Sequence, residues 1–333
     1  MTGSKMPEMK IEVTNLCIHG RCKFCSPLFR PMVQEAEAKE FLAQLEMHLD
    51  QYLTSGGRHI LLTGGGEPID APKKLFGAIE LINRKKAELG VELELLTIYT
   101  NGVSMLKRWS RDTSETNLDA LVRLGVRDIN LSVHGGNEEE RTSTSGPYMG
   151  ALDIEHLVTE ALRRGVRVMT RTVITDVGID AVEKIDAFAH HMDTLGVHIA
   201  YFSDMFQVPI RNEETVPGSQ TILTWSDEHR VSFDNLVAAL NASEDFELLT
   251  EYKRHNNQGN TFEFRRRGYD LRIMLGDLVI GNESATDLTY AYIKPDGSIA
   301  CHNNARCDSP RRYVPVDEIK SYLKAYRPGR DDL

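Results

Sequence analysis

The sequence predicts an α/β protein built around a parallel sheet. Two observations favour this fold class. Short apolar segments alternate with amphipathic helical segments through the first two-thirds of the chain, and glycines follow most of the helical segments. Alternating strands and helices demand parallel strands with right-handed crossovers. A barrel, a partial barrel and a doubly wound sheet would each satisfy this pattern.

Six strand–helix units, or nearly six, follow one another. The strands are apolar and rich in β-branched residues, and we expect them at residues 10–14, 59–63, 94–99, 128–133, 167–174 and 198–202. The helices carry apolar residues at helical spacing, and we expect them at residues 35–53, around 75–82, and at 118–124, 154–162 and 182–192. Glycines at 56, 90, 125, 165 and 196 end these helices.

The last third of the chain differs in pattern. We expect a loop at 215–224, a helix at 227–240, a hairpin of 262–266 with 270–274, a second hairpin of 290–294 with 298–301, and a short helix at 316–326. A Pro-Asp-Gly turn joins the strands of the second hairpin. The sequence therefore predicts a core over residues 1–215 and a C-terminal α+β extension over 216–333.

Charge and hydropathy argue against nucleic-acid binding, membrane binding and secretion. The chain has 333 residues, with 39 Lys and Arg against 49 Asp and Glu, which gives a net charge of −10. An acidic chain is a poor binder of nucleic acid or anionic membranes. It contains no apolar run of the ~18 residues that a membrane helix needs, and its first ten residues lack the apolar core of a secretion signal. We therefore expect a cytoplasmic protein, in which thiols stay reduced.

Three of the five cysteines, Cys17, Cys22 and Cys25, follow directly after the first expected strand. An odd number of clustered cysteines in a reducing compartment favours metal ligation or catalysis over disulfides. Zinc is one option, with His19 as a fourth ligand. An iron–sulfur cluster is the other, and with three protein ligands it would leave one iron open. The cysteines alone do not decide between the two.

A glycine-rich motif, Leu62-Thr-Gly-Gly-Gly-Glu-Pro68, ends the second expected strand. Its glycines allow close approach of the backbone to a ligand, and Glu67 adds a carboxylate able to hold an ammonium group. Such a motif alone indicates only a tight turn. Together with the cysteine motif, at the carboxyl end of a neighbouring parallel strand, it indicates an active site.

Over residues 9–205 these ordered motifs resemble the radical S-adenosylmethionine (SAM) enzymes. Tyr99-Thr-Asn-Gly102 after the third strand and Asn130-Leu-Ser-Val-His-Gly135 after the fourth also resemble that superfamily. The resemblance implies a partial (β/α)6 barrel. The cysteine spacing is Cys-x4-Cys-x2-Cys, whereas Cys-x3-Cys-x2-Cys is usual in the superfamily, so the subfamily stays open.

The resemblance also implies a set of site residues. Cys17, Cys22 and Cys25 would bind a [4Fe–4S] cluster whose open iron takes the amino and carboxylate groups of SAM. The candidate SAM-binding residues are Phe24 for the adenine, Gly64, Gly65, Gly66 and Glu67 for the methionine amino group, Asn101, Ser132 for the ribose, and Arg171 for the methionine carboxylate. Arg171 is equally compatible with an ordinary strand charge that faces solvent.

The implied activity is reductive cleavage of SAM to a 5′-deoxyadenosyl radical, which takes a hydrogen atom from a small polar substrate. Epimerisation, dehydrogenation or rearrangement would follow, and flavodoxin or ferredoxin would supply the electron. Three alternatives stay open: a non-catalytic zinc-binding regulatory protein, an iron–sulfur lyase that does not use SAM, and a radical SAM maturase that modifies a peptide.

Cys301 and Cys307 lie near the end of the chain and are too few for a second cluster. Cys301 is the candidate catalytic thiol, which would donate a hydrogen atom to a substrate radical. A metal pair with His302 and two ordinary buried cysteines are the alternatives. Asp204 and Arg211, after the sixth strand, are further candidates for substrate contact.

Overall fold

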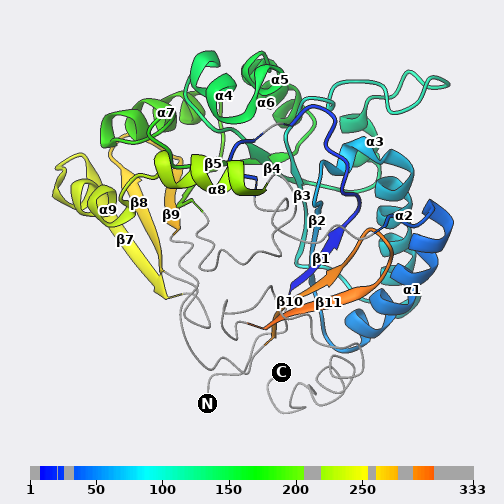
Figure 1. Cartoon of the computed structure of the whole chain (residues 1–333). Coiled ribbons are helices and arrows are strands. Elements are labelled where there is room, and N and C mark those ends of the chain that lie inside the picture. The colour runs from blue at the N-terminus through cyan, green and yellow to red at the C-terminus, as the bar shows by residue number, and fades with distance from the viewer. Residues whose placement is uncertain are drawn as a thin grey trace, which may run out of the picture.

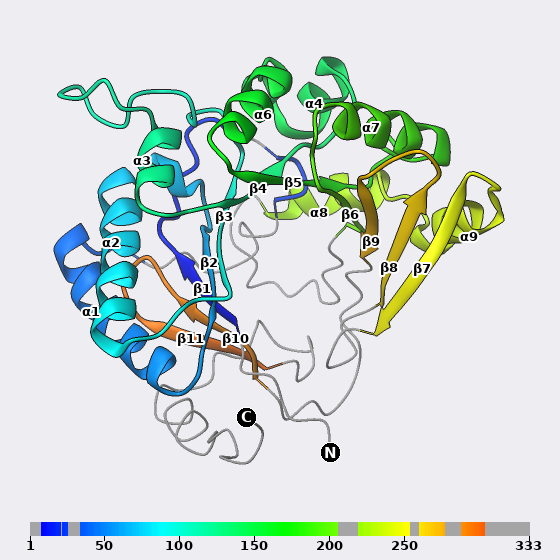
Figure 2. The ribbon, with the colours of Figure 1, turned by 180° about the vertical axis from the view of Figure 1, so that it is seen from behind.

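A computed structural model describes residues 8–20, 22–25, 34–205, 219–253, 260–276 and 288–303. It confirms the predicted fold class, because helices pack along the outer side of one curved and mostly parallel sheet (Figure 1). Figure 2 shows the same arrangement from behind, with the sheet forming an open, partial barrel.

All six predicted strand–helix units are present except for a helix directly after the sixth strand, where residues 206–218 are not described. The strands are β1 (Glu8–Glu12), β2 (His59–Thr63), β3 (Leu95–Thr100), β4 (Asp128–Ser132), β5 (Arg167–Val173) and β6 (Ile199–Ser203). The helices that connect them are α1 (Ala38–Thr54), α2 (Pro72–Leu89), α3 (Asn117–Arg123), α6 (Ile154–Arg163) and α7 (Val182–Thr194). Three short helices were not predicted, namely η2 (Pro68–Asp70), α4 (Glu138–Ser145) and α5 (Pro147–Gly150).

Local signals explain where the helices begin and end. Helix α3 starts with a capping box, in which the Thr116 side chain accepts from the Asp119 amide and the Asp119 carboxylate accepts from the Thr116 amide. Helix α2 starts at Pro72 and stops at Gly90, which adopts the left-handed conformation with φ of 63°. The sequence therefore sets these boundaries without help from tertiary contacts.

The C-terminal strands extend the same sheet at both of its edges. The strand order is β11-β10-β1-β2-β3-β4-β5-β6-β9-β8-β7, and all neighbours from β10 to β9 run parallel. The edge elements are β7 (Phe246–Lys253), β8 (Asn260–Arg266), β9 (Arg272–Gly276), β10 (Leu288–Ile293) and β11 (Ile299–Asn303). Both predicted hairpins are present as antiparallel pairs. The division between residues 215 and 216 stays a prediction.

Two predictions for the C-terminal region were wrong. The expected loop at 215–224 contains the start of helix α8 (Ser219–Glu228), and the expected helix at 227–240 is interrupted before α9 (Phe233–Ala242). Ser232 explains the interruption, because its side chain caps α9 by accepting from the Asn235 amide. Tertiary packing of α8 outweighs its weak helical propensity. The expected helix at 316–326, Cys307 and Arg211 lie outside the described residues.

The two faces of the sheet have different chemistry. Side chains that face the helices form the apolar core, and they include Ile11, Leu62, Ile98, Ile129 and Val168. Side chains alternate along a strand, so the intervening residues face the inner, concave side. Many of these are polar, namely Lys10, Glu12, Thr63, Tyr99, Asn130, Ser132 and Arg171. The concave side is therefore the polar side of the sheet.

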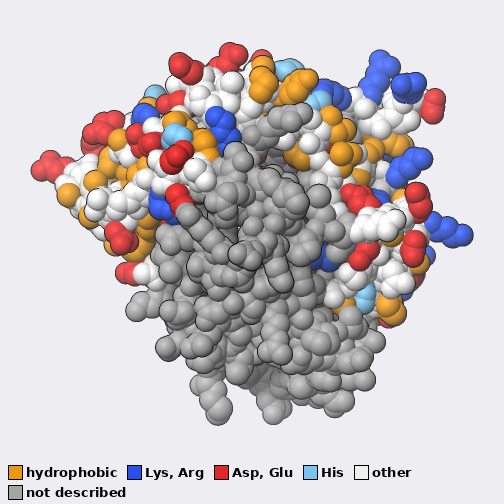
Figure 3. All heavy atoms as spheres, viewed as in Figure 1, with side chains coloured by type: hydrophobic (Ala, Val, Ile, Leu, Met, Phe, Trp, Pro, Cys, Tyr) orange, Lys and Arg blue, Asp and Glu red, His pale blue; other side chains and the backbone are white. Residues whose placement is uncertain are grey.

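The described helices include none with the length and apolar character needed to span a bilayer. On the face shown in Figure 3, acidic side chains occur around the described margin and are interspersed with basic ones.

Candidate active site

The carboxyl ends of β1 to β5 bring together the candidate residues of the first two-thirds of the chain. The cysteine loop, defined here as residues 15–20 and 22–25, follows β1. Gly64 to Glu67 follow β2, Asn101 follows β3, Ser132 ends β4, and Arg171 lies opposite Ser132 in β5. In parallel α/β folds this edge of the sheet is where ligands bind.

Backbone hydrogen bonds fix the cysteine loop against the glycine-rich turn. The Glu67 amide donates to the Leu16 carbonyl at 2.7 Å, and the Gly66 amide donates to the Thr14 carbonyl at 2.9 Å. Further along the loop, the Ile18 amide donates to Oδ2 of Asp70 at 2.7 Å. The two motifs therefore form one connected unit.

A carboxylate before α1 holds the start of the loop. Oε1 of Glu35 accepts from the Thr14 hydroxyl and from the Asn15 amide, both at 2.6 Å. Its Oε2 accepts from Nζ of the buried Lys74 at 2.9 Å, and Lys74 also donates to the Pro295 carbonyl at 3.2 Å. Partial burial alone would raise the pKa of Glu35, but these hydrogen bonds lower it below its ordinary value. Sequence reasoning missed this clamp.

Cys17, Cys22 and Cys25 carry thiols that are not joined in disulfides, and these thiols differ in exposure. Cys17 is exposed, whereas Cys22 and Cys25 are partly buried. Burial, with a smaller contribution from neighbouring Cys25, raises the pKa of the Cys22 thiol to about 12. A metal centre must therefore displace the thiol proton when it binds. Within the described ranges, no three His, Cys, Asp or Glu side chains are arranged to hold a single metal ion.

Two polar side chains lie beside these thiols. Nδ2 of Asn101 points toward Sγ of Cys17 at 3.9 Å, which is within the range of a weak N–H···S hydrogen bond. Nδ1 of His19 is buried and has no hydrogen-bond partner within the described ranges, and its Nε2 lies 3.4 Å from Nζ of Lys107. Three thiols on one anchored loop, with an amide donor next to a sulfur, are a donor set that fits an iron–sulfur cluster.

Glu67 is buried and fully engaged inside the protein. Its carboxylate accepts from the Thr100 hydroxyl at 2.7 Å, from the Asn101 amide at 2.6 Å and from the Ile69 amide at 3.2 Å. Burial raises the pKa of Glu67 to about 7 in spite of these donors. The side chain therefore ties the ends of β2 and β3 together. Its direct contact with a methionine amino group stays a prediction.

Gly66 is required by the packing of the two motifs. A Cβ atom at this position would lie 1.9 Å from the Leu16 carbonyl oxygen. At Gly65 a Cβ atom would meet Oδ1 of Asn15 at 3.0 Å, which is tight but less severe. Gly66 thus allows the glycine-rich turn to pack closely against the cysteine loop.

An aromatic wall stands beside Phe24, the residue before Cys25. The His134 ring meets Phe24 edge-on at 4.7 Å between centroids, and the Trp225 ring of α8 lies 6.1 Å away. His134 is buried, and its Nδ1 accepts from the Val173 amide at 3.1 Å. Burial, followed by the charge of Arg171, lowers the pKa of His134 to about 3. Trp225 was missed because it lies between the expected loop at 215–224 and the expected helix at 227–240, where no structure was predicted.

Ser132 and Arg171 are partners in the register of β4 and β5. The guanidinium of Arg171 stacks over the Tyr201 ring at 4.6 Å, and among the described residues no carboxylate forms an ion pair with it. Both side chains face the concave side. An arginine held by an aromatic ring and without a carboxylate partner is well suited to a planar anion.

The remaining candidates lie at the edges of the described chain. Cys301 is in β11 and pairs in register with Ala291 of β10, which in turn neighbours β1. Asp204, after β6, is buried, and its Oδ1 lies 3.7 Å from Nη1 of Arg230.

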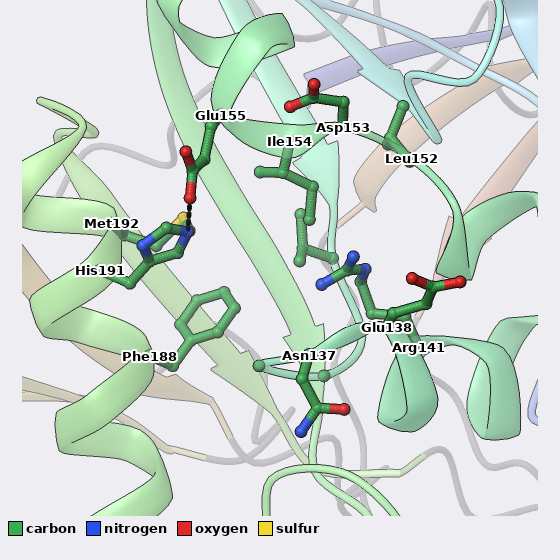
Figure 4. A pocket seen from close by; sticks show the side chains of 13 residues that line it. Asn137, Glu138, Arg141, Leu152, Asp153, Ile154, Glu155, Phe188, His191 and Met192 are labelled. Atoms are coloured by element: carbon green, nitrogen blue, oxygen red, sulfur yellow. Dashed lines mark ion pairs between the residues drawn. The ribbon is translucent and has the colours of Figure 1, made fainter.

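A separate pocket of about 360 Å³ lies between α4, α6 and α7. Figure 4 shows that Phe188 and Met192 line this pocket beside an ion pair between His191 and Glu155. Nε2 of His191 lies 3.7 Å from Oε1 of Glu155. Neither the cysteine loop nor the glycine-rich turn contributes to its lining.

The fold and the site define an α/β partial barrel with a thiol loop at the carboxyl edge of its sheet. The sequence model of the Radical SAM superfamily matches residues 11–188, which is more than half of the chain. The chain belongs to this superfamily, and the superfamily implies SAM and an iron–sulfur cluster.

Solved structures share this fold at low sequence identity. SuiB of Streptococcus suis bound to its precursor peptide SuiA aligns with a TM-score of 0.53 and 15% identity, over 98% of this chain and 65% of SuiB. SuiB without the peptide aligns with a TM-score of 0.52 and 14% identity, over 98% of this chain and 66% of SuiB. SuiB bound to SAM aligns with a TM-score of 0.44 and 14% identity, over 68% of this chain and 46% of SuiB. The chain thus spans less than two-thirds of the length of these proteins. No curated protein matches the sequence.

Proposed function

We propose that the protein is a radical SAM enzyme that binds a [4Fe–4S] cluster through Cys17, Cys22 and Cys25 and acts on a small polar substrate. The observation that carries this proposal is the hydrogen-bonded unit of cysteine loop and glycine-rich turn at the carboxyl ends of β1 and β2. Three thiols from one short loop are typical ligands of an iron–sulfur cluster. The N–H group of Asn101 next to Cys17 would tune the cluster by hydrogen bonding to a sulfur.

SAM would lie across the strand ends beside the cluster. The backbone of Gly64, Gly65 and Gly66 would line the methionine amino group, and Glu67 would hold this edge in shape through Thr100 and Asn101. On the other side, Phe24 with His134 and Trp225 would enclose the adenine. Ser132 would contact the ribose. Arg171 would pair with the methionine carboxylate, since its guanidinium has no carboxylate partner among the described residues.

When bound, the cluster and SAM would supply a 5′-deoxyadenosyl radical by one-electron reductive cleavage, and flavodoxin or ferredoxin would be the electron donor. The protein's own contribution is to orient the groups and to exclude water. The aromatic wall at Phe24 serves the second purpose. We expect these reactions to take place in the cytoplasm.

Cys301 is proposed as the thiol that completes the reaction. It would give its hydrogen atom to a substrate radical, and the resulting thiyl would be restored by one electron from the same donor and one proton from solvent. With the substrate known, turnover in deuterated water should place deuterium on the product carbon. Cys301→Ala should still form 5′-deoxyadenosine but lose that product, and normal product from the variant would remove Cys301 from the mechanism.

Metal analysis of protein purified without oxygen tests the cluster. Iron and sulfide near four each per chain support the proposal, whereas stoichiometric zinc without iron would establish the alternative of a zinc-binding regulatory protein. Cys22→Ala should lose most of the iron, and Cys307→Ala, the matched control, should keep it. Wild-type protein with dithionite and SAM should release 5′-deoxyadenosine. Iron without any binding of SAM would favour a lyase that does not use SAM.

A further inference from the structure

The concave face of β4 carries a buried amide whose oxygen has no hydrogen-bond partner in the part of the chain that the structure describes. Ile129 and Leu131 belong to the apolar core, and Leu131 approaches Leu157 of α6 near Gly102. Asn130 stands between them in the strand, so its side chain points to the opposite, concave side. Helices α3, α6 and α7 lie on the other side of the sheet (Figures 1 and 2).

The hydrogen bonds of Asn130 are incomplete. The residue is only 2% exposed, and among the described residues its Oδ1 has no hydrogen-bond partner. Within the same described ranges its Nδ2 contacts the weak acceptor Sδ of Met169 at 3.6 Å. A buried amide oxygen without a donor is destabilising, because it has lost water and gained nothing in return. A bound molecule with an O–H or N–H group would supply the donor that the described residues do not.

Asn130 lies two residues before Ser132 in β4, and therefore farther from the carboxyl end of the strand than the proposed SAM-binding residues. Asn130 pairs with Tyr99 of β3 and with Met169 of β5, whereas Ser132 pairs with Arg171. Two residues along a strand advance about 6.6 Å. A molecule bound at Asn130 would therefore lie below the ribose end of SAM, on the side of the sheet where the radical would form.

Two buried hydroxyl groups in the neighbouring strands do have hydrogen-bond partners. The Thr172 hydroxyl donates to the Val133 carbonyl at 2.6 Å, and the Thr100 hydroxyl donates to Glu67 at 2.7 Å. The Thr170 hydroxyl likewise has no hydrogen-bond partner in the described part of the chain, but it faces the helices and is fully buried. It therefore offers a matched control on the opposite side of the adjacent strand.

We propose that Asn130 is a substrate-binding residue, whose Oδ1 accepts a hydrogen bond from an O–H or N–H group of a small polar substrate. Nδ2 donates to an acceptor on the same molecule, and Tyr99 adds a polar aromatic wall. The substrate class is thus a metabolite with a neighbouring donor and acceptor, as in an amide, an amino acid or a sugar diol. This inference rests on the proposed function, because that function places the radical at this face.

Stability measurements provide the first test. Asn130→Leu and Thr170→Val each replace an unpartnered polar side chain by an apolar one of similar size, so each metal-free variant should melt at or above the wild-type temperature. A clear drop for Asn130→Leu alone would mean that the amide supports the fold, and the proposal would then fail.

Ligand binding provides the second test. Reconstituted protein with SAM is incubated with a defined mixture of free amino acids, nucleosides and monosaccharides, and retained compounds are identified by mass spectrometry. Wild type and Thr170→Val should retain the same compound, and Asn130→Leu should bind it at least about tenfold more weakly. Equal retention by Asn130→Leu, or no retained compound with wild type, would overturn the proposal.

Different results would refute the substrate role of Asn130 and the proposed radical SAM function. SAM affinity and basal release of 5′-deoxyadenosine should be the same in wild type and Thr170→Val, because Thr170 lies outside the proposed site. Loss of SAM affinity in Asn130→Leu would assign Asn130 to SAM instead of the substrate. Absence of iron and of SAM cleavage in wild type would instead refute the proposed function, whatever the amide binds.

Discussion

Nζ of Lys74 lies 2.9 Å from Oε2 of Glu35, and this ion pair joins α2 to the segment that holds the first residues of the cysteine loop. The pair is partly shielded, with side-chain exposures of 8% for Lys74 and 34% for Glu35. Because Glu35 also accepts from Thr14 and Asn15, the position of the loop depends on a lysine 59 residues further along the chain than Asn15.

Lys74→Met should therefore loosen the cysteine loop. The variant keeps the aliphatic length but leaves Glu35 and the Pro295 carbonyl without their donor, so we expect a loss of about 1–3 kcal/mol in unfolding free energy. Hydrogen exchange at the Asn15 amide should become faster, and iron uptake on reconstitution should fall. Lys73→Met, at the exposed neighbouring position, is the control and should change none of these. Unchanged exchange in Lys74→Met would show that the clamp does not position the loop.

We expect Gly66→Ala to displace the cysteine loop, and so to lower iron binding more directly than it lowers SAM binding. The added methyl group would overlap the Leu16 carbonyl oxygen, so the loop must move and iron binding should drop severalfold. Gly136→Ala is the matched control, because its nearest atom outside adjacent residues would lie at an ordinary 3.4 Å. Full iron content with weakened SAM binding in Gly66→Ala would contradict this expectation and would favour direct contact of Gly66 with SAM.

Glu67→Ala should release the loop after β3. The change removes the acceptor of the Asn101 amide and of the Thr100 hydroxyl, so hydrogen exchange at Asn101 should rise at least about tenfold in protein without SAM. SAM affinity should fall in the same variant. Glu94→Ala removes an exposed carboxylate and should leave both measurements unchanged. Weaker SAM binding with unchanged exchange would instead indicate direct contact between Glu67 and SAM.

Acid should destabilise the protein in part through His134. Its pKa is about 3 in the folded protein against an ordinary value of 6.5, because burial disfavours the charged ring. Between these values the unfolded chain binds the proton more readily, so the stabilisation is complete above pH 6.5 and is lost as the pH falls toward 3. From pH 7 to pH 5 this amounts to about 2 kcal/mol.

His134→Asn keeps a hydrogen-bond acceptor for the Val173 amide but cannot titrate. Urea unfolding of metal-free wild type and variant at pH 7 and pH 5 should show a smaller loss for the variant, by about 2 kcal/mol. The same loss in both proteins would mean that His134 is already accessible to protons in the folded state.

Local patterns predicted the parts of the site that lie within one segment. Cys17, Cys22 and Cys25 occur within nine residues, and Gly64 to Glu67 are consecutive, so each motif is visible in the sequence alone. The predicted strands and helices of the first two-thirds agree with the structure for the same reason, since their periodicity and terminal glycines are local.

Contacts between distant segments escaped prediction. Nothing near Glu35 or Lys74 indicates that they meet, and α8 was missed because Trp225 is positioned by tertiary packing near Phe24 and Lys23. The role of Glu67 as a tie between two strand ends depends equally on Thr100 and Asn101, which lie more than thirty residues away. The placement of the C-terminal strands at both sheet edges is likewise a non-local property.

The parallel pairing of β10 with β1 has a consequence for the order of events during synthesis. Lys294 bonds to Glu12 across 282 residues, and the Pro295 carbonyl bonds to Lys74 across 221. The cysteines are translated more than two hundred residues before Lys294 and Pro295, which make one side of the clamp. Contacts of such high sequence separation form late, because the loop must close first. We therefore expect the nascent chain to carry its thiols on an incompletely anchored loop until β10 has docked, so that loading of the proposed cluster follows completion of the sheet.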